Sequence, residues 1–483
     1  MKPFTLLFLL CLPFLCPQTT ISAPNVLWVY VDDMSDWLGC YGYDAVPTPH
    51  IDRLAKSGTR FERAYMPSPV CSTTRSALIT GTMQTSHGLH HHRTTLKEPL
   101  PDGIQTIPER FREAGYLTFN ESKEDYNFTY DRDHLFSPEF DRPGIKGHLA
   151  GRNLSWLEQL KGKPFFGQIQ LKGGKFEGET GSKYPAHSRV KEADVTVPPY
   201  YPDNPVIRNA IARHYEQIVE TDQQVGAIMA ALDEFGLSEN TVVFFFTDHG
   251  CPLPRSKQFL YEDGTKVPLI VAGPGIPADA VRTDLVSGID IPSTSLALAN
   301  IPAPGYIEGH DLFAEKSPKR DHVISARDRC GIATDRIRAV RTDRFRYIRN
   351  YQTDRALYQP QYRDKFATFV LLHDLYEEGK LDALPASYHD PAQRPAEELY
   401  DLKNDPDQTV NLAGDPEYAT QIEEHRKLLE SWEQASDDKG RYPESEAKLK
   451  AVADQYGAER CVAPEFSFLV KQNNQPKSRI REN

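Results

Sequence analysis

Uninterrupted apolar runs and one long amphipathic stretch dominate the first two thirds of the chain. Residues 25–33 (NVLWVYVDD), 241–250 (TVVFFFTDHG) and 267–273 (VPLIVAG) are apolar runs, and the first two end in charged residues. Such runs are typical of strands buried on both faces of a parallel sheet. Residues 204–236 carry apolar side chains at helical spacing and end at Gly236, which predicts one long helix. We therefore expect an α/β fold with a large, mostly parallel sheet sandwiched by helices.

The pattern changes after residue 320. Residues 338–350 (RAVRTDRFRYIRN) alternate arginine with apolar or aromatic residues, and 398–413 (ELYDLKNDPDQTVNLA) predict a strand, a turn and the start of a helix. A period of two is typical of antiparallel strands with one solvated face, and we interpret the arginines as that face. We place the α/β domain at 24–320 and a smaller C-terminal α+β lobe with an antiparallel sheet at 321–483.

The N-terminus and the overall charge limit the location and the partners. Residues 1–23 contain one lysine, a short apolar run and a small-residue exit at Ala23, which predicts a signal peptide and a periplasmic or extracellular protein. No later run approaches the roughly 20 apolar residues that a membrane span needs. The net charge of −12 gives nucleic acid no overall attraction, so an anionic substrate must be held by local cations.

Charged residues follow two of the predicted strands. Asp32 and Asp33 end the first strand, and Asp248 and His249 end the strand at 241–247. The carboxyl ends of parallel strands meet at one edge of a sheet, so the two pairs can converge. Neighbouring carboxylates repel each other unless a cation lies between them, and oxygen ligands suit calcium or magnesium. The sequence therefore predicts a site for one divalent ion.

A cysteine stands at the start of a predicted short helix. In the segment 71–81 (CSTTRSALITG), Cys71 lies where a helix N-terminus favours an anion or a thiolate, and Arg75 follows one turn later. The segment resembles the signature of the type I sulfatases, the formylglycine-dependent family of the alkaline-phosphatase superfamily: Cys-x-Pro/Ala-x-Arg and a helix ending in Thr-Gly. The similarity extends through both strand ends, residues 256–271 (SKQFLYEDGTKVPLIV) and residues 398–413, and so covers nearly the whole chain in the expected order.

The resemblance implies a mechanism and a set of site residues. A maturation enzyme would convert Cys71 to formylglycine (3-oxoalanine), whose aldehyde hydrate is the nucleophile. The modified Cys71 and four side chains would bind one Ca²⁺: Asp32, Asp33, Asp248 and His249. The sulfate would be held by Arg75, Lys123 and Lys257. The substrate would be a sulfated sugar or polysaccharide.

Three positions depart from the family pattern. Thr73 stands where Pro or Ala is usual in the element that the maturation enzyme reads. Asp125 replaces the histidine of the Lys-x-His element, and a further histidine is absent after the strand 164–171, where KGGK follows. Lys172 or Lys175 could replace that acid, with Lys175 preferred by rough alignment, if its pKa were lowered by burial or by neighbouring cations.

A second source of the proton is a histidine cluster after the Cys71 helix. It comprises His87, His90, His91 and His92. The simplest interpretation of this cluster is a polar loop of solvated side chains, but one member could lie near the pocket.

The function predicted from these features is an exported, calcium-dependent sulfatase that acts on the sulfate esters, or the N-sulfates, of sulfated sugars or polysaccharides. Two alternatives stay open. The same anion site could serve phosphate esters, as a phosphatase or phosphodiesterase of the same superfamily. Thr73 and the absent histidines also suit a degenerate sulfatase that binds sulfated glycans without turnover.

Overall fold

The structure is a computed structural model that describes residues 23–138, 154–175, 190–316 and 318–469. The predicted signal peptide, residues 1–23, lies outside the described residues except for Ala23. None of the helices within the described ranges is both long and apolar enough to cross a membrane.

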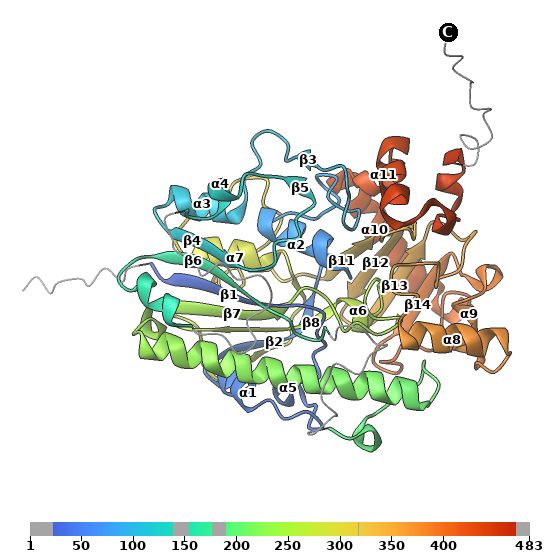
Figure 1. The fold of residues 1–483 in the computed structure, drawn as a ribbon, viewed down its shortest axis with the longest axis horizontal. Coiled ribbons are helices and arrows are strands. Elements are labelled where there is room, and N and C mark those ends of the chain that lie inside the picture. The colour runs from blue at the N-terminus through green and yellow to red at the C-terminus, as the bar shows by residue number, and fades with distance from the viewer. Residues whose placement is uncertain (1–22, 139–153, 176–189, 317, 470–483) are drawn as a thin grey trace, which may run out of the picture.

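A large sheet forms the centre of the molecule (Figure 1). Its eight strands run in the order β10-β2-β8-β7-β1-β6-β4, and β9 pairs with β2. All pairs are parallel except those that β8 makes with β7 and β2. The predicted mostly parallel sheet is confirmed. The strands are β1 (Asn25–Val31), β2 (Gly58–Tyr65), β4 (Leu117–Glu121), β6 (Phe165–Leu171), β7 (Thr241–Thr247), β8 (Lys266–Ala272), β9 (Ala280–Arg282) and β10 (Val286–Ser287).

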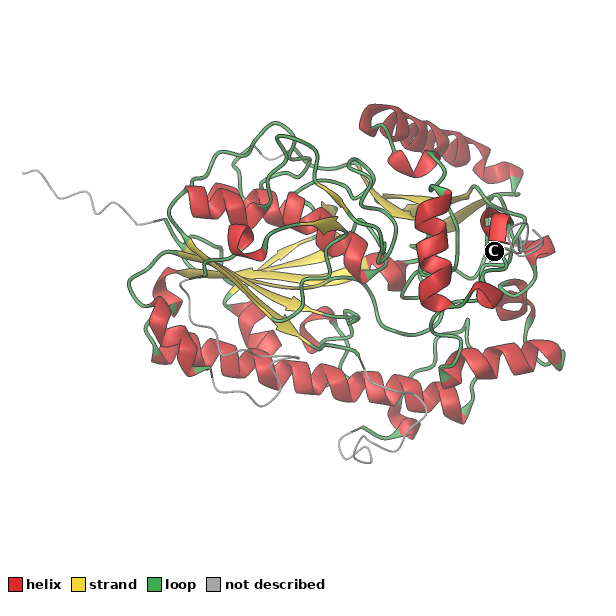
Figure 2. Ribbon diagram, turned by 45° about the horizontal axis from the view of Figure 1, so that its top comes forward, coloured by secondary structure: helices red, strands yellow, loops and turns green. Residues whose placement is uncertain are grey.

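Helices cover both faces of this sheet, as Figures 1 and 2 show. On one face lie α1 (Pro49–Lys56) and α5 (Pro205–Glu234), and on the other lie α2 (Cys71–Thr80), α3 (Ile107–Glu113), α4 (Arg132–Leu135) and α7 (Asp290–Leu298). The predicted long helix is α5, whose first turn is capped by the Asn204 side chain accepting from the Val206 N–H at 2.9 Å.

The central strand β1 is apolar after its first residue, Asn25, because it is covered on both faces. Val29 packs in the core on the α5 side, whereas Trp28 and Tyr30 pack in the core on the α2 side. Successive side chains of a strand point to opposite faces, so a strand covered on both faces has no polar position until it leaves the sheet. In β1 that point is Asp32.

The C-terminal lobe contains a second, antiparallel sheet in the order β11-β12-β13-β14. One face packs against α10, and the other contacts Phe259, Leu260 and Tyr261, just after Lys257. The elements of this part are β11 (His322–Arg327), β12 (Ile337–Thr342), β13 (Phe345–Asn350), β14 (Glu397–Asp401), α8 (Ala367–Glu377), α9 (Ala383–Ser387), α10 (Ala419–Ser436) and α11 (Glu446–Tyr456). The remaining strands and α-helix of the described residues are β3 (Glu98–Pro99), β5 (Phe128–Thr129) and α6 (Glu262–Thr265).

The interpretation of the arginines of the second sheet as a solvated face is wrong for three of them. Arg338, Arg341 and Arg346 are buried. Arg338 pairs with Asp438 at 2.9 Å and Asp328 at 3.1 Å, and Arg346 pairs with Glu262 at 2.8 Å. Neither face of this sheet is left open to solvent, and the surrounding segments bring carboxylates to the guanidinium groups. The alternation of residues predicted the strands correctly, but it could not show which carboxylates pair with the arginines.

Candidate active site

The charged ends of β1 and β7 meet, as the sequence predicts. The two strands are parallel neighbours, and the Asp248 N–H donates to the Val31 carbonyl at 3.0 Å. The Asp33 N–H donates to Asp248 Oδ1 at 3.0 Å, and Asp33 has a positive φ of 50°. This turn ends the strand and places the carboxylates of Asp33 and Asp248 side by side.

Cys71 lies directly above these strand ends, as the first residue of α2. Its Sγ atom is 3.2 Å from His249 Nε2, 3.4 Å from Lys257 Nζ and 3.6 Å from Asp33 Oδ1. The segment that carries Lys257 is fixed to the segment before Cys71 because the Gln258 N–H donates to the Pro69 carbonyl at 2.8 Å. Residues that are distant in the sequence thus converge on one buried sulfur.

The residues present fit a divalent ion. One ligand atom from each of Asp33, Cys71, Asp248 and His249 lies within 4.8 Å of the others, and all four residues are buried. Burial, together with the neighbouring Asp32 carboxylate, raises the pKa of Asp248 to about 8 against the opposing effect of His249. A buried carboxylate that is unfavourable as an anion is stabilised by a cation beside it. The oxygen ligands suit Ca²⁺ or Mg²⁺.

Asp32, the fifth predicted ligand, contacts three cationic side chains in the structure. Its carboxylate accepts from Arg75 Nη2 at 2.6 Å, Lys123 Nζ at 2.8 Å and Lys175 Nζ at 2.6 Å. Arg75 also donates to Asp248 at 3.3 Å. The cations predicted to hold a sulfate therefore gather at the metal site, where Lys257 also pairs with Asp33 at 2.6 Å.

These contacts favour the ionised form of the cysteine. Burial alone would raise the pKa of Cys71, but Lys123, Lys257 and His249 lower it well below its usual value. Burial would also raise the pKa of Asp33, and Lys257 and Lys175 lower it. The site thus stabilises negative charge at the position of Cys71, at the N-terminus of α2.

The two glycines of the KGGK segment are explained by their close approach to the residues that follow β1. It follows β6, and the Gly174 N–H donates to the Asp32 carbonyl at 2.9 Å. A Cβ atom at Gly173 would lie 2.1 Å from the Asp32 carbonyl oxygen, and one at Gly174 would lie 2.0 Å from that of Asp33. Only glycine allows this approach, which carries Lys175 to Asp32.

Lys175 does not have the lowered pKa on which its role as a proton donor depends. Burial would lower the pKa of Lys175, but Asp32 and Asp33 raise it well above its usual value. Asp125, in place of the family's histidine, is also held in ion pairs, with Arg93 at 3.2 Å and Lys123 at 3.6 Å. Thr73 fits its position, since its hydroxyl donates to Ser68 Oγ at 2.6 Å.

The histidine cluster is not the solvated loop of the simplest interpretation, because His90 and His92 are buried. His92 is the member beside the site. Burial alone would lower its pKa, but Cys330 and, to a smaller extent, Cys71 raise it above the usual value. The imidazole stacks on Tyr362, with ring centroids 5.7 Å apart. His92 is therefore the member of the cluster whose titration responds to Cys71.

Sequence reasoning missed three further residues around the site. Gln170 accepts from Arg75 Nη1 at 2.7 Å and orients the guanidinium. The Arg93 N–H donates to Ser72 Oγ at 2.9 Å and ties the histidine segment to α2. Tyr362 comes from the C-terminal lobe. The polar Gln170 at the end of an apolar strand was a usable signal, whereas no local pattern marks Arg93 or Tyr362.

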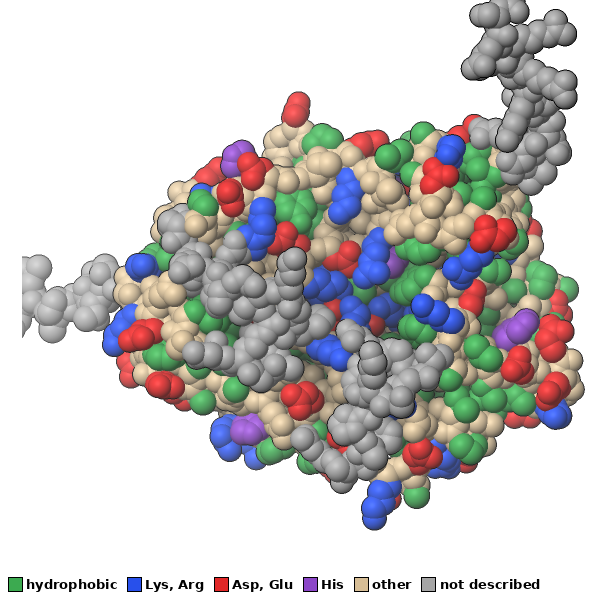
Figure 3. Space-filling model, in the orientation of Figure 1, with side chains coloured by type: hydrophobic (Ala, Val, Ile, Leu, Met, Phe, Trp, Pro, Cys, Tyr) green, Lys and Arg blue, Asp and Glu red, His purple; other side chains and the backbone are tan. Residues whose placement is uncertain are grey.

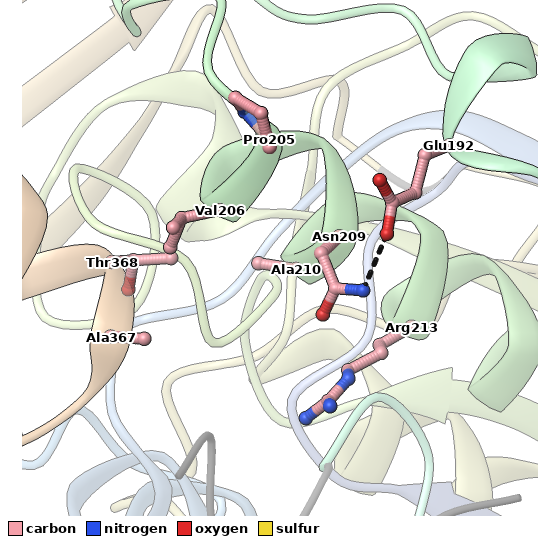
Figure 4. A pocket seen from close by; sticks show the side chains of 8 residues that line it. All are labelled: Glu192, Pro205, Val206, Asn209, Ala210, Arg213, Ala367 and Thr368. Carbon is pink, nitrogen blue, oxygen red and sulfur yellow. Dashed lines mark hydrogen bonds between the residues drawn. The ribbon is translucent and has the colours of Figure 1, made fainter. Parts of the chain in front are cut away.

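The surface above the site is cationic. Figure 3 shows Lys and Arg side chains gathered around a hollow near the middle of one face, over the strand ends of the main sheet. A separate cavity of about 340 Å³ lies between the start of α5 and α8, where Asn209 donates to Glu192 at 2.7 Å (Figure 4). None of the site residues named above lines it.

Comparison with known proteins agrees with this geometry. Residues 24–301 match the family model "Sulfatase", and residues 255–391 match the C-terminal model of N-sulphoglucosamine sulphohydrolase. The chain is 33% identical over 470 residues to an ulvan-active sulfatase of Formosa agariphila, covering 88% of this chain and 77% of that protein. It is 26% identical to human N-sulphoglucosamine sulphohydrolase, covering 86% of this chain and 90% of that protein.

Solved structures show the same fold. A 2-O GAG sulfatase aligns with a TM-score of 0.62 at 21% identity, covering 88% of this chain and 96% of that chain. A phosphonate monoester hydrolase of Agrobacterium radiobacter aligns with a TM-score of 0.60 at 17% identity, covering 86% and 96%. The strand-end carboxylates, the buried Cys71 and the family match lead to one conclusion: the chain belongs to the sulfatase family, whose members hydrolyse sulfuric esters.

Proposed function

We propose that this protein is an exported, calcium-dependent sulfatase that removes sulfate from sulfated sugars or polysaccharides through a formylglycine made from Cys71. The observation that carries the proposal is the position of Cys71 Sγ, within 3.6 Å of Asp33, His249 and Lys257 at the start of α2. The relatives named above act on ulvan or on N-sulphoglucosamine, which supports a sulfated carbohydrate as the substrate class.

Asp33, Asp248, His249 and position 71 would hold the ion, and Asp32 would be the fifth ligand. When bound, the ion would neutralise charge on the sulfate oxygens, and the formylglycine hydrate would supply the attacking hydroxyl. Arg75, Lys123 and Lys257 remain as protein cations, and they would pair with the sulfate once the ion takes over the carboxylates. Lys175 belongs with them, because a lysine of raised pKa binds anions but donates a proton poorly.

We assign the transfer of a proton to the leaving alcohol to His92. The family's Lys-x-His histidine is absent, and the aspartate in its place is ion-paired with Arg93. Among the clustered histidines, His92 is the buried one whose pKa the Cys71 side chain raises. Its stacking on Tyr362 fixes the plane of the ring, and a fixed imidazole is an efficient general acid.

The first test is the mass of the tryptic peptide that carries Cys71, from protein made in a host with a sulfatase maturation system. Formylglycine lowers that mass by about 18 Da relative to cysteine, because oxidation of the side chain replaces sulfur and hydrogens by an aldehyde oxygen. Sulfate release is then measured on ulvan, heparan sulfate and chondroitin 6-sulfate. An unmodified thiol in a host that matures other sulfatases, with no sulfate release, contradicts the proposal.

The phosphatase alternative is tested in the same preparation. Rates are compared for 4-nitrophenyl sulfate and 4-nitrophenyl phosphate, which share a leaving group. We expect the sulfate to react faster, because the described residues offer ligand atoms for a single metal group. Faster cleavage of the phosphate would favour the alternative. Tight glycan binding without any turnover would instead favour the degenerate sulfatase.

A further inference from the structure

The segment that carries Lys257 has a backbone that its own residue types do not favour. It lies between His249 and α6, and within it Arg255 and Gln258 have positive φ values of 63° and 78°. A residue other than glycine is less stable in this left-handed region, so such a backbone persists only where its surroundings hold it. The position of the Lys257 ammonium group therefore depends on contacts from outside the segment.

A buried arginine of the C-terminal lobe supplies two of these contacts. Arg363 Nη1 donates to the Pro252 carbonyl at 2.8 Å, and Arg363 Nη2 donates to the Lys257 carbonyl at 2.8 Å. Arg363 is 1% exposed. A planar guanidinium group holds its nitrogens at a fixed spacing, so it also fixes the spacing of the two carbonyls that it binds. Arg363 thereby fixes the main chain on both sides of Arg255.

These contacts determine where the ammonium group of Lys257 lies. Lys257 Nζ is 2.6 Å from Asp33 Oδ2 and 3.4 Å from Cys71 Sγ. The Lys257 carbonyl is held by Arg363, and the Lys257 N–H donates to the Cys251 carbonyl at 3.1 Å. A lysine side chain is flexible, so it is directed at a fixed point only if its backbone is fixed. Arg363 thus reaches the site through Lys257.

The same turn of the C-terminal lobe contacts a second side chain of the site. Tyr362, the residue before Arg363, stacks on His92 with ring centroids 5.7 Å apart and ring planes inclined by 22°. The turn is closed by a hydrogen bond of its own, from the Gln361 N–H to Asp364 Oδ2 at 2.8 Å. This one turn therefore touches the site at two points, the backbone of Lys257 and the ring of His92.

A second buried arginine offers a matched comparison. Arg346 of β13 also holds the segment, because its Nη1 atom donates to the Leu260 carbonyl and to Thr265 Oγ1, the latter at 2.9 Å. These acceptors lie after Lys257, and Arg346 is ion-paired with Glu262 at 2.8 Å. Figure 1 shows β13 beside α6, where these contacts are made. Loss of Arg346 should disturb the packing of the lobe without releasing the Lys257 carbonyl.

We propose that Arg363 is a positioning residue for sulfate binding. It fixes the main chain of Lys257 so that the ammonium group points at the Cys71 position, and it makes the C-terminal lobe part of the anion site. The inference rests on the proposed function, since it takes Lys257 as a sulfate-binding residue. It adds that the lobe acts on the reaction through the backbone of the α/β domain and not through packing alone.

The test is a double-mutant cycle on the affinity for inorganic sulfate, measured by titration calorimetry with the calcium-loaded protein. Arg363→Met is expected to weaken sulfate binding about tenfold, because a displaced ammonium group loses contact with the anion. The variant Lys257→Met/Arg363→Met is expected to bind no more weakly than Lys257→Met alone, since Arg363 acts through Lys257. Full additivity of the two losses, or unchanged binding by Arg363→Met, would overturn the proposal.

Two further variants separate positioning from a general loss of stability. Arg346→Met is expected to lower the Tm but to change the sulfate affinity by less than about twofold, because it leaves the Lys257 carbonyl in place. Arg363→Lys can still donate to one of the two carbonyls, and it is expected to bind sulfate more tightly than Arg363→Met. It also replaces Arg363→Met in the cycle if that variant does not fold. Equal weakening by Arg346→Met and Arg363→Lys would overturn the proposal.

The cycle and the proposed function fail in distinguishable ways. A non-additive cycle in a protein that releases sulfate from no ester would contradict the sulfatase activity and support the role of Arg363. Turnover in a protein whose cycle is additive would contradict the role of Arg363 alone. Absence of sulfate binding by the wild type would contradict both.

Discussion

Charged side chains are buried in two regions of this molecule, around Cys71 and in the second sheet of the C-terminal lobe. In the lobe, Arg338 lies between Asp438 and Asp328, and Arg336 also donates to Asp438. Burial would raise the pKa of Asp438, but Arg338 and Arg336 lower it well below its usual range. Here each charge has a partner, and the carboxylate is stable as an anion.

Around Cys71 the buried carboxylates are neutralised to different extents. Asp32 receives three cations at 2.6–2.8 Å, whereas the pKa of Asp248 is raised to about 8. Burial of charge alone therefore does not distinguish a functional site from a structural network. The distinguishing features are the unevenly neutralised carboxylates and, beside them, a buried Cys71 whose ionised form is favoured, because a ligand that brings charge can stabilise the carboxylates.

The largest effect is expected at the nucleophile position. Cys71→Ala should reduce sulfate release by at least about 10⁴-fold, because no other group can form the covalent intermediate. The matched control is Cys251→Ala, which removes a buried thiol that donates to Ser256 at 3.3 Å. The control should retain activity. Substantial turnover by Cys71→Ala, measured as released sulfate, would contradict the assignment of the site.

Two aspartate substitutions, one near Cys71 and one in the C-terminal lobe, test the difference between the two regions most directly. Asp248→Asn should lower kcat/KM by about 10²–10³-fold through loss of a metal ligand, with no loss of stability in the ion-free protein. Asp438→Asn should instead lower the free energy of unfolding by about 3–5 kcal/mol, since it leaves buried guanidinium groups without their carboxylate.

Thermal unfolding of the two aspartate variants, measured with and without Ca²⁺, tests these two predictions. Calcium should raise the Tm of wild type and of Asp438→Asn but not that of Asp248→Asn. If both variants lost stability to the same extent and neither lost its response to calcium, the contrast between the two regions would be wrong.

The role of His92 is tested through the leaving group. His92→Asn should slow sulfate release from a sugar alcohol by about 10²-fold, because the alcohol must be protonated as it leaves. With 4-nitrophenyl sulfate the loss should be small, since nitrophenolate leaves without a proton. Lys175→Met is measured on the same two substrates as the comparison variant. Equal losses on both substrates for His92→Asn, or a leaving-group effect in Lys175→Met instead, would move the proton donor to another residue.

The smallest effect is the pH dependence of the structural network. The pKa of Asp438 is lower in the folded than in the unfolded state, so its contribution to stability is present above the unfolded value, near 4, and is lost as the pH falls through the folded value. The difference in Tm between wild type and Asp438→Asn should therefore shrink as the pH is lowered from about 5 towards 2. A difference that stays constant over this range would show that Asp438 does not stabilise the network as an anion.

The local pattern was sufficient for much of the fold and of the site. The apolar runs located β1, β7 and β8, and the helical spacing located α5, because burial on both faces of a sheet or on one face of a helix leaves a periodic record. The carboxylates and Cys71 were found for the same reason, since they end or begin these elements. The prediction of solvated side chains was wrong for Arg338, Arg341 and Arg346 and for His90 and His92, because burial of a polar side chain depends on partners from other segments.

The sequence by itself determined which chemistry is available: paired carboxylates at strand ends, a cysteine at a helix start, and cations spaced along the chain. Only the tertiary structure decided which of those groups meet. It placed His92, and not another member of the histidine cluster, near Cys71, directed Lys123 and Lys175 to Asp32, and placed His87, His90 and His91 along the wall of a separate cavity between the loop after α2 and the loop before α11. The physical reason is that hydrophobic periodicity acts within an element, whereas pairing and desolvation of charges act between elements that only the folded chain brings together.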